Sequence, residues 1–312
     1  MKKYALLLMA VVLMGLAAGC GPQQEAKKDL QPLNIGLMPD TDSLPFIVAQ
    51  EKGYFKEEGL EVNIQQYKSA MDRDSALQSG NLDGAISDML AVAFAKDGGF
   101  NVKVTSFTDG SYKLIAGAQS SAAKMADLKG QDVAVSRNTI IEYVTDQILQ
   151  KENLGEDTIN KVIIPQIPTR LEMLQNGKLG AATLPEPMAS IAVHNGCKYV
   201  TGSDELGINP GVIMFTAKTA NDRRAELAAM YRAYNKAVDY LNNTPREEYI
   251  DMLVEKASFP PTAKAALKLP EYHHAALPKE SDVVDCVKWL QGKGLIKKNY
   301  TYADFVVDVL GK

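Results

Sequence analysis

The sequence has little of what marks several large classes of protein. Its 312 residues include three cysteines, three histidines and one tryptophan, and the cysteines show no metal-binding or redox spacing. The formal net charge is −4 and no basic run occurs, so the chain has no electrostatic footprint for nucleic acid. A G-x-S-x-G elbow and a G-x-x-x-x-G-K phosphate loop are both missing. We therefore predict a protein that is not an enzyme, needs no cofactor or metal, and has no nucleic-acid partner.

The first twenty residues have the pattern of a bacterial lipoprotein signal. Two lysines follow the initial methionine, residues 4–18 carry no charge, and a glycine precedes Cys20. The uncharged stretch is shorter than a membrane-spanning helix requires, and the polar residues after it disfavour an uncleaved anchor, which is the alternative. We predict a signal peptide over 1–19, lipid attachment at Cys20 and a tether over 20–32. The protein is then expected on the extracytoplasmic face of the cell membrane, either periplasmic or at the cell surface.

Removal of the signal leaves a chain long enough for two lobes. Two lysines leave with it, so the formal charge falls from −4 to −6. Cys197 and Cys286 remain beside the lipid-bearing cysteine, and we expect both to be small buried apolar side chains. A disulfide between them stays open, because sequence alone does not place their Cα atoms within bridging distance. We expect a monomer.

Short apolar runs alternate with longer helical patterns in two series along the chain. The first series covers 33–87 and the second covers 132–184. Strand followed by helix, repeated, is typical of a parallel α/β sheet. Each series ends in the same unit of helix, glycine and strand, with Gly80 and Gly177 as left-handed helix caps. The sequence therefore predicts two similar lobes.

The rest of the chain determines how the lobes are connected. From about residue 219 the pattern is helical to the end, and we expect these helices to pack on the first lobe. The first lobe is then predicted to comprise 33–110 and 211–312, with the second lobe, 111–210, inserted between them. Two strands that cross between the lobes would form the hinge.

Four segments carry a family resemblance: LNIGLMPDTDSLPFIVAQEKGYFKEEGLEV, LQSGNLDGAISD, DLKGQDVAVS and LPEP. Together they resemble the solute-binding proteins of ABC importers for nitrate, sulfonates, taurine and thiamine-precursor pyrimidines, the SsuA/THI5-like family. The resemblance implies an α/β fold, a periplasmic-binding-protein type II clamshell whose two lobes each hold a mostly parallel sheet flanked by helices. It also implies that a small solute is captured between the lobes and delivered to an ABC permease and its ATPase.

Ligands of open parallel sheets bind beyond the carboxyl ends of the strands, where helices begin with unpaired N–H groups. Four loops of this chain have that position, two in each predicted lobe, so we expect them to face one solute. The candidate ligand-binding residues in or beside these loops are Asp40, Asp42, Ser43, Ser87, Asp88, Asn138, Thr139, Glu142, Glu186 and, from a neighbouring loop, Arg73.

Acidic residues outnumber basic ones in these loops, where Arg137 and Arg73 are the cations. A carboxylate at a helix N-terminus already satisfies the helix dipole and repels a second anion. We therefore expect a small polar organic solute with an amine, amidine or aminopyrimidine-like donor face. Its donors would bond to one or two of four acids: Asp42, Asp88, Glu142 and Glu186. A sulfonate, taurine or nitrate is the alternative.

Structural roles compete with ligand binding at several of these positions. Asp88 stands where an N-cap is expected, and Thr139 with Glu142 fits a capping box. Either Asp40 or Asp42 is expected to cap the turn at residue 43, and we favour Asp42 as the ligand contact.

Glu186 lies between two prolines that fix its backbone, which favours a ligand or hinge role, and Arg170 is expected within its reach. Tyr112 and Tyr143 are candidates for stacking on a flat solute, although buried packing is the commoner role of tyrosine.

Two further functions are compatible with the same fold. One is a tethered sensor that uses the clamshell without transport. The other is a biosynthetic enzyme resembling the thiamine-pyrimidine synthases, which use a cysteine cluster that this chain lacks.

Overall fold

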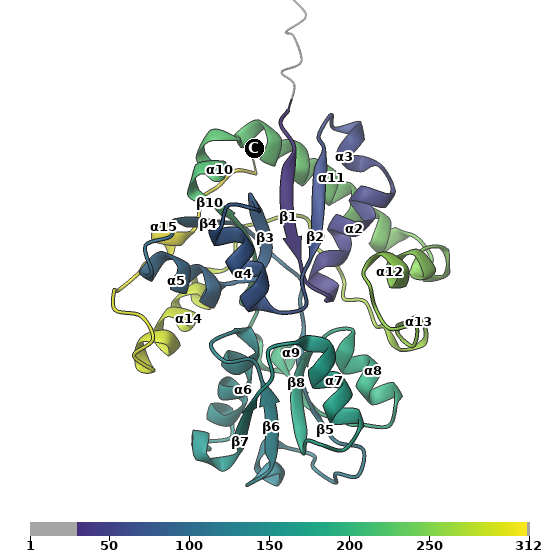
Figure 1. Ribbon diagram of the computed structural model, residues 1–312, viewed down its shortest axis with the longest axis vertical. Coiled ribbons are helices and arrows are strands. Elements are labelled where there is room, and N and C mark those ends of the chain that lie inside the picture. The colour runs from purple at the N-terminus through teal and green to yellow at the C-terminus, as the bar shows by residue number, and fades with distance from the viewer. Residues whose placement is uncertain (1–29, 311–312) are drawn as a thin grey trace, which may run out of the picture.

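The computed structural model describes residues 30–310 of the chain. The predicted signal peptide, Cys20 and most of the tether lie outside the described residues and stay predictions. Two five-stranded sheets flanked by helices form two lobes, one above the other along the long axis of the molecule (Figure 1). Within residues 30–310, no helix combines the length and the apolar character that crossing a membrane requires.

The sheet of the first lobe has the strand order β2-β1-β3-β10-β4. The first three strands in this order are parallel, whereas β10 is antiparallel to both of its neighbours. The buried residues of β3 extend along its whole length, as expected for a strand covered on both faces. The strands are β1 (Leu33–Leu37), β2 (Val62–Gln66), β3 (Gly84–Asp88), β4 (Val102–Phe107) and β10 (Gly211–Thr216).

The sheet of the second lobe repeats this plan with the order β7-β6-β8-β5-β9. Here β6 is parallel to β7 and β8, and β5 is antiparallel to β8 and β9. The chain crosses between the lobes over residues 108–111 and again over 203–210, so two connections form the hinge. The strands are β5 (Tyr112–Ala116), β6 (Asp132–Val135), β7 (Asn160–Ile163), β8 (Ala181–Pro185) and β9 (Lys198–Gly202).

Helices cover both sheets. Those of the first lobe are the 3-10 helix η1 (Thr41–Ser43), α2 (Leu44–Glu51), α3 (Tyr54–Glu57), α4 (Ala70–Gln78) and α5 (Met89–Asp97). The second lobe has η2 (Met125–Leu128), α6 (Ile140–Lys151), η3 (Glu156–Thr158), α7 (Ile167–Gln175), α8 (Met188–His194) and, at the hinge, α9 (Ser203–Leu206). The expected glycine caps are present, since Gly80 and Gly177 both have positive φ.

The C-terminal region is helical, as predicted. Its elements are α10 (Ala217–Asp222), α11 (Arg224–Asn243), η4 (Arg246–Glu248), α12 (Ile250–Lys256), α13 (Ala263–Ala266), α14 (Glu280–Gly292) and α15 (Tyr302–Phe305). Helix α11 packs on α2 and α3, and the rings of Phe46 and Tyr234 meet edge to face at 5.4 Å.

The C-terminal helices also reach the second lobe, which the sequence pattern did not indicate. Helix α13 contacts α8, and the Trp289 indole of α14 donates to Asp146 of α6 at 3.2 Å.

Two questions from the sequence concern the cysteines and the lobe boundaries. Cys197 and Cys286 are both free and buried, so they do not form a disulfide with each other. The predicted boundaries at residues 110/111 and 210/211 remain predictions.

Gly84 opens β3, the strand that ends at Asp88. A Cβ atom at this position would lie 2.5 Å from Cε1 of Phe215 and 2.7 Å from the Met214 carbonyl oxygen, both on β10. We expect Gly84→Ala to lower the free energy of unfolding by about 1 to 3 kcal/mol, because the neighbouring strand must shift. Urea unfolding measures this change.

The matched control is Gly292→Ala in α14, where an added Cβ atom meets nothing within 4 Å. Alanine is the better helix former, so this variant should be as stable as the wild type or more stable. Equal stability of the Gly84→Ala variant and the wild type would contradict the packing described for β3 and β10.

Candidate functional site

A cavity of about 40 Å³, lined mostly by buried residues, lies where the two lobes meet. At roughly 10 to 15 Å³ for each water, it has room for about three water-sized groups. Loops at the carboxyl ends of strands from both sheets supply its lining, as predicted. The lining residues are Met38, Asp40, Ala70 and Asp88 from the first lobe, with Tyr112, Ser136, Thr139, Ile140, Ile141, Pro165, Ile167, Arg170 and Pro185 from the second.

Direct hydrogen bonds hold the lobes together around this interlobe cavity. The Thr41 N–H donates to the Glu186 carbonyl oxygen at 3.0 Å, and the Ile167 N–H donates to the Lys68 carbonyl oxygen at 3.1 Å. The Gln166 amide also donates to the Asp72 carboxylate at 3.1 Å. The lobes are therefore in contact with each other around the cavity.

Asp40 combines a structural role with a place in the cavity. Its carboxylate is the N-cap of η1 and accepts hydrogen bonds from the Ser43 N–H at 3.2 Å and the Ser43 hydroxyl at 2.8 Å. Burial raises the pKa of Asp40 from 3.8 to about 6, against the opposing effect of the Ser43 bonds. The cap predicted for this turn therefore comes from Asp40, and Ser43 is engaged in holding the loop.

Asp42 lies beside the cavity and not in its lining. Its carboxylate accepts from the Thr108 hydroxyl at 2.8 Å and from the Tyr112 hydroxyl at 3.1 Å, on the two sides of a hinge connection. Burial, followed by the nearby charge of Asp40, raises the pKa of Asp42 well above its usual range. This acid links η1 to the hinge, while Tyr112 itself reaches the cavity.

Asp88 is the second acid of the lining. It caps α5 by accepting from the Ala91 N–H at 2.9 Å, which confirms the predicted N-cap. Burial raises the pKa of Asp88, although the charge of Arg73 acts in the opposite direction. Arg73 is buried behind β3, where it donates to the Ile86 carbonyl oxygen and pairs with Asp74 at 2.8 Å. Neither Arg73 nor Ser87 lines the cavity.

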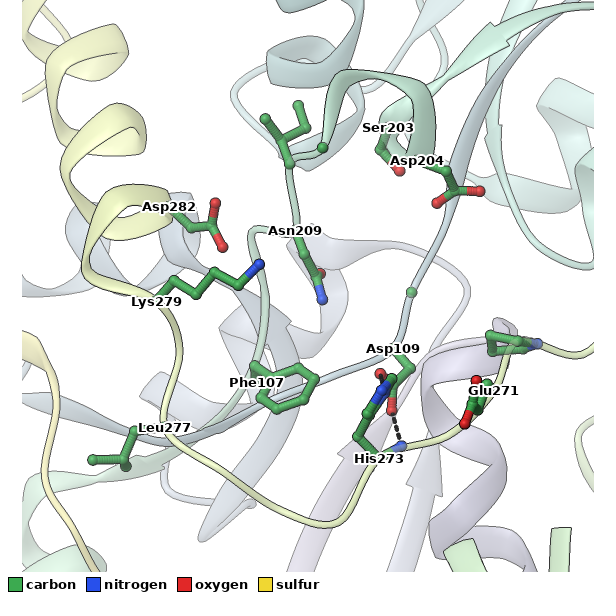
Figure 2. A pocket seen from close by; sticks show the side chains of 14 residues that line it. Phe107, Asp109, Ser203, Asp204, Asn209, Glu271, His273, Leu277, Lys279 and Asp282 are labelled. Atoms are coloured by element: carbon green, nitrogen blue, oxygen red, sulfur yellow. Dashed lines mark hydrogen bonds and ion pairs between the residues drawn. The ribbon is translucent and has the colours of Figure 1, made fainter. Parts of the chain in front are cut away.

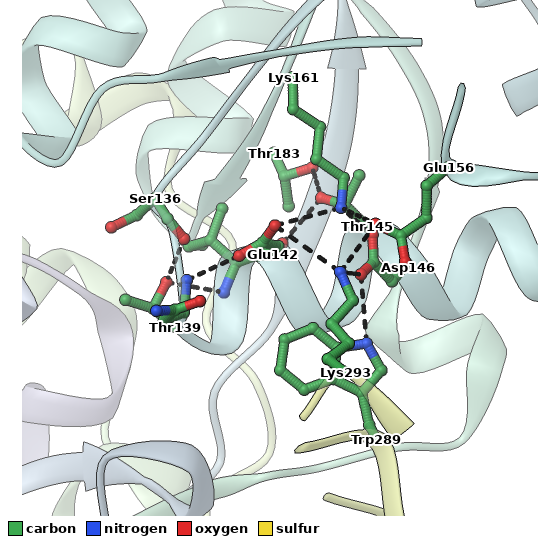
Figure 3. A network of polar contacts seen from close by, with 12 residues as sticks. Ser136, Thr139, Glu142, Thr145, Asp146, Glu156, Lys161, Thr183, Trp289 and Lys293 are labelled. Carbon is green, nitrogen blue, oxygen red and sulfur yellow. Dashed lines mark hydrogen bonds and ion pairs between the residues drawn. The ribbon is translucent and has the colours of Figure 1, made fainter. Parts of the chain in front are cut away.

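In the second lobe, Thr139 lines the cavity and is the N-cap of α6. Its hydroxyl accepts from the Ile141 N–H at 3.3 Å, and the Glu142 carboxylate accepts from the Asn138 N–H at 2.7 Å. The predicted capping box is not formed, because neither side chain bonds to the backbone N–H of the other residue. Glu142 and Asn138 are outside the lining. The Glu142 carboxylate belongs to an ion-pair network, in which the Lys161 ammonium lies 3.2 Å away and neutralises its charge (Figure 3).

Glu186 is also engaged by its own lobe. Its carboxylate pairs with Lys113 at 2.6 Å and accepts from the Ser190 N–H at 3.0 Å and the Ser190 hydroxyl at 2.9 Å. The expectation that Arg170 reaches Glu186 is wrong, because the Arg170 guanidinium donates instead to the carbonyl oxygens of Ile164 and Pro165. Glu186 contributes its backbone to the closure of the lobes, and its side chain does not line the cavity.

Arg170 is the charged residue of the lining that sequence reasoning did not place there. It lies in the first turn of α7, is 1% exposed, and its Nε atom has no hydrogen-bond partner. Burial lowers the pKa of Arg170 to about 9. Its position in the first turns of α7 between Ile167 and Leu171, two buried residues one helical turn apart, is the signal in the sequence that points to burial.

Tyr143 is not available for stacking on a solute in the cavity. Its ring packs edge to face against Trp289 at 5.6 Å, in the core between α6 and α14. Of the two tyrosines considered above, Tyr112 alone is in the cavity lining.

A larger hollow of about 530 Å³ lies at the hinge, lined among others by Phe107, Asp204, Asn209 and Lys279 (Figure 2). It contains none of the predicted site residues, and its Asp109 carboxylate is already bonded to the His273 N–H and imidazole at 2.8 Å. Among residues 30–310, no cluster of three or more His, Cys, Asp or Glu side chains is arranged to hold a metal ion. We therefore place the candidate site at the interlobe cavity.

A model of the family described as NMT1/THI5 like matches residues 40–248, about two thirds of the chain. The chain belongs to this family. A putative aliphatic sulfonates-binding protein of Bacillus subtilis (strain 168) is 23% identical over 249 residues, which cover 76% of this family member and 74% of the relative. A 4-amino-5-hydroxymethyl-2-methylpyrimidine phosphate synthase of Saccharomyces cerevisiae is 36% identical over 68 residues, 22% of this chain and 20% of the synthase.

Solved structures show the fold of this family member. The alkanesulfonate-binding protein SsuA from Xanthomonas axonopodis pv. citri, bound to MOPS, superposes with a TM-score of 0.75 at 16% identity. The superposition covers 89% of this chain and 98% of SsuA. The predicted periplasmic-binding-protein clamshell and the predicted family are both confirmed.

The buried carboxyl of Asp40 gives a prediction for stability against pH. Its proton is held more tightly in the folded chain than in the unfolded one, because its pKa is raised from 3.8 to about 6. Its contribution to the free energy of unfolding is therefore complete below pH about 4 and lost as the pH rises through about 6. Asp40→Asn keeps a side-chain oxygen as the cap and should stabilise the protein by about 2 kcal/mol at pH 7.5.

Urea unfolding at pH 7.5 and pH 4.5 measures this effect. The stabilisation by Asp40→Asn should shrink by more than half at the lower pH, where the wild-type carboxyl is protonated. Asp222→Asn, at a largely exposed position, is the control and should show no comparable change. A stabilisation that grows as the pH falls would contradict the burial of an ionisable Asp40.

Proposed function

We propose that this protein is an extracytoplasmic solute-binding protein that captures a small polar organic solute and delivers it to an ABC permease and its ATPase. One observation supports this most: a cavity at the carboxyl ends of the strands lies between the lobes and takes ionisable side chains from both of them. Asp40 and Asp88 come from the first lobe and Arg170 from the second. The names of the B. subtilis and Xanthomonas relatives, both sulfonate-binding proteins, point to the same class of function.

The proposed mechanism is closure of the clamshell. A solute that contacts both lobes binds the closed arrangement more tightly than the open one, so it raises the population of closed molecules. A solute held by one lobe has no such preference and leaves the equilibrium unchanged. The closed shape is then the form that the permease distinguishes from the empty protein.

The two acids of the cavity favour a solute with an amine or another cationic donor, such as an amidine or aminopyrimidine. A cation near Asp40 and Asp88 compensates the cost of ionising buried carboxyls, whose pKa values are raised by burial. The proposed solute contacts exclude Glu142 and Glu186, because lysines of their own lobe neutralise these two carboxylates. Asp42 acts through Tyr112 and the hinge.

The proposal includes the anchor. Residues 1–19 would be removed and Cys20 would carry the lipid that holds the protein at the membrane. The Cys20→Ala variant should then be found in the soluble fraction instead of the membrane fraction. Immunoblotting of the two fractions measures this change. Retention of this variant in washed membranes would contradict the lipid anchor without affecting the proposed cavity.

Asp88 provides the test of the solute contacts. We expect Asp88→Asn to weaken binding of an amine-bearing solute by about 10- to 100-fold, since a hydrogen bond to a charged group contributes about 1.5 to 3 kcal/mol. Native mass spectrometry of the purified wild type identifies a retained solute, and isothermal titration measures its affinity.

Asp222→Asn is the matched control and should bind like the wild type. Wild-type affinity in the Asp88→Asn variant would contradict the assignment of the cavity. Tight binding of nitrate together with no binding of any amine would contradict the proposed chemistry of the solute.

A further inference from the structure

We propose that the solute also carries an acidic group, and that Arg170 binds this group from the second lobe while Asp40 and Asp88 bind the amine from the first. The ligand would be a small zwitterion, such as an amino acid or an aminosulfonate. This inference rests on the proposed solute-binding function and narrows it, because an aminopyrimidine without an acidic group leaves Arg170 unpaired.

The argument begins with the surroundings of Arg170. A guanidinium has five N–H donors, and here the contacts are two carbonyl oxygens at 2.8 and 3.2 Å, both bonded by Nη1. The Nε atom is buried without a partner, and no acidic side chain of residues 30–310 lies within ion-pair distance. A buried cation with unmade hydrogen bonds is costly unless an anion is supplied.

Other cations close to the interlobe cavity already have acidic partners. Arg73 pairs with Asp74 at 2.8 Å, and Lys113 pairs with Glu186 at 2.6 Å. Lys161 lies 2.5 Å from Asp146 in the network behind α6. Arg170 differs from these three because it lines the cavity and has only neutral acceptors. Its charge is therefore available to a ligand.

The two signs of charge come from opposite lobes. Burial is the sole cause of the lowered pKa of Arg170, so Asp40 and Asp88 do not compensate its charge directly. A zwitterion placed between them provides an anion on one side and a cation on the other, and both contacts form only when the lobes close. Arg and carboxylate or sulfonate oxygens also make strong, directional pairs.

The size of the cavity limits the choice of solute. With about 40 Å³ between the lobes, even short molecules such as β-alanine and taurine require the lobes to separate before they fit. Bulky ring-bearing sulfonates require a much larger opening. The structure thus favours an acid and an amine joined by a short linker.

The test is a titration panel on the signal-free protein. β-Alanine and taurine carry both charges, ethylamine carries the amine alone, and propionate and ethanesulfonate carry the acid alone. We expect at least one zwitterion to bind the wild type at least 10-fold more tightly than any singly charged compound. Arg170→Gln should weaken zwitterion binding at least 10-fold and leave ethylamine bound at least as tightly as in the wild type, because the variant removes the contact with the acid and also a positive charge that repels the ammonium group.

A second measurement separates this role from a structural one. Removal of an unpaired buried charge should leave thermal unfolding of the ligand-free Arg170→Met and Arg170→Gln variants at or above the wild-type temperature. Arg73→Gln is the matched control, since it breaks a buried ion pair and should unfold at a lower temperature. Destabilisation of both Arg170 variants to the same extent as Arg73→Gln would overturn the inference.

The outcomes also separate this inference from the proposed function. Equal affinities for ethylamine and the zwitterions, or the same loss for both in Arg170→Gln, would overturn the inference and leave the binding function in place. No binding by any compound, together with no retained solute in native mass spectrometry, would contradict both.

Discussion

The structure depends on one constraint: ionisable side chains are buried where two lobes meet, and they do not pair with each other across the cavity. Asp40, Asp88 and Arg170 are each at most 7% exposed. Burial shifts the pKa of both acids upward and that of the arginine downward, so each charge is opposed by its surroundings. A closed empty cavity is therefore less favourable electrostatically than one that holds compensating charges, which gives a solute its influence on closure.

The same side chains also build the loops that present them. Asp40 caps η1, Asp88 caps α5 and Thr139 caps α6, so local folding determines where each polar group points. Each cap lies at the carboxyl end of a strand, and the two sheets bring these ends together at one level (Figure 1). Asp42 extends this arrangement to the hinge through Thr108 and Tyr112. The lining of the cavity and the hinge thus share neighbouring residues of one short loop.

Local patterns predicted much of this structure, and long-range contacts account for what they missed. Strand–helix periodicity, the glycine caps and the N-caps at Asp88 and Thr139 depend on neighbours in the chain, so they were readable from the sequence. Glu142 and Glu186 were readable as acids in loops, but their neutralising lysines come from other strands: Lys161 from β7 and Lys113 from β5. The cavity role of Arg170 was missed for the same reason, since the absence of a partner is visible only in three dimensions.

The most direct test of this account is the proton balance of binding. Isothermal titration at pH 6 with the tightest-binding zwitterion, repeated in two buffers of different ionisation enthalpy, gives the number of protons exchanged. An ammonium group beside Asp40 lowers a pKa that burial has raised to about 6, so the account predicts net release of protons and affinity that rises from pH 5 to pH 7. Net proton uptake, or an affinity independent of pH over this range, would contradict it.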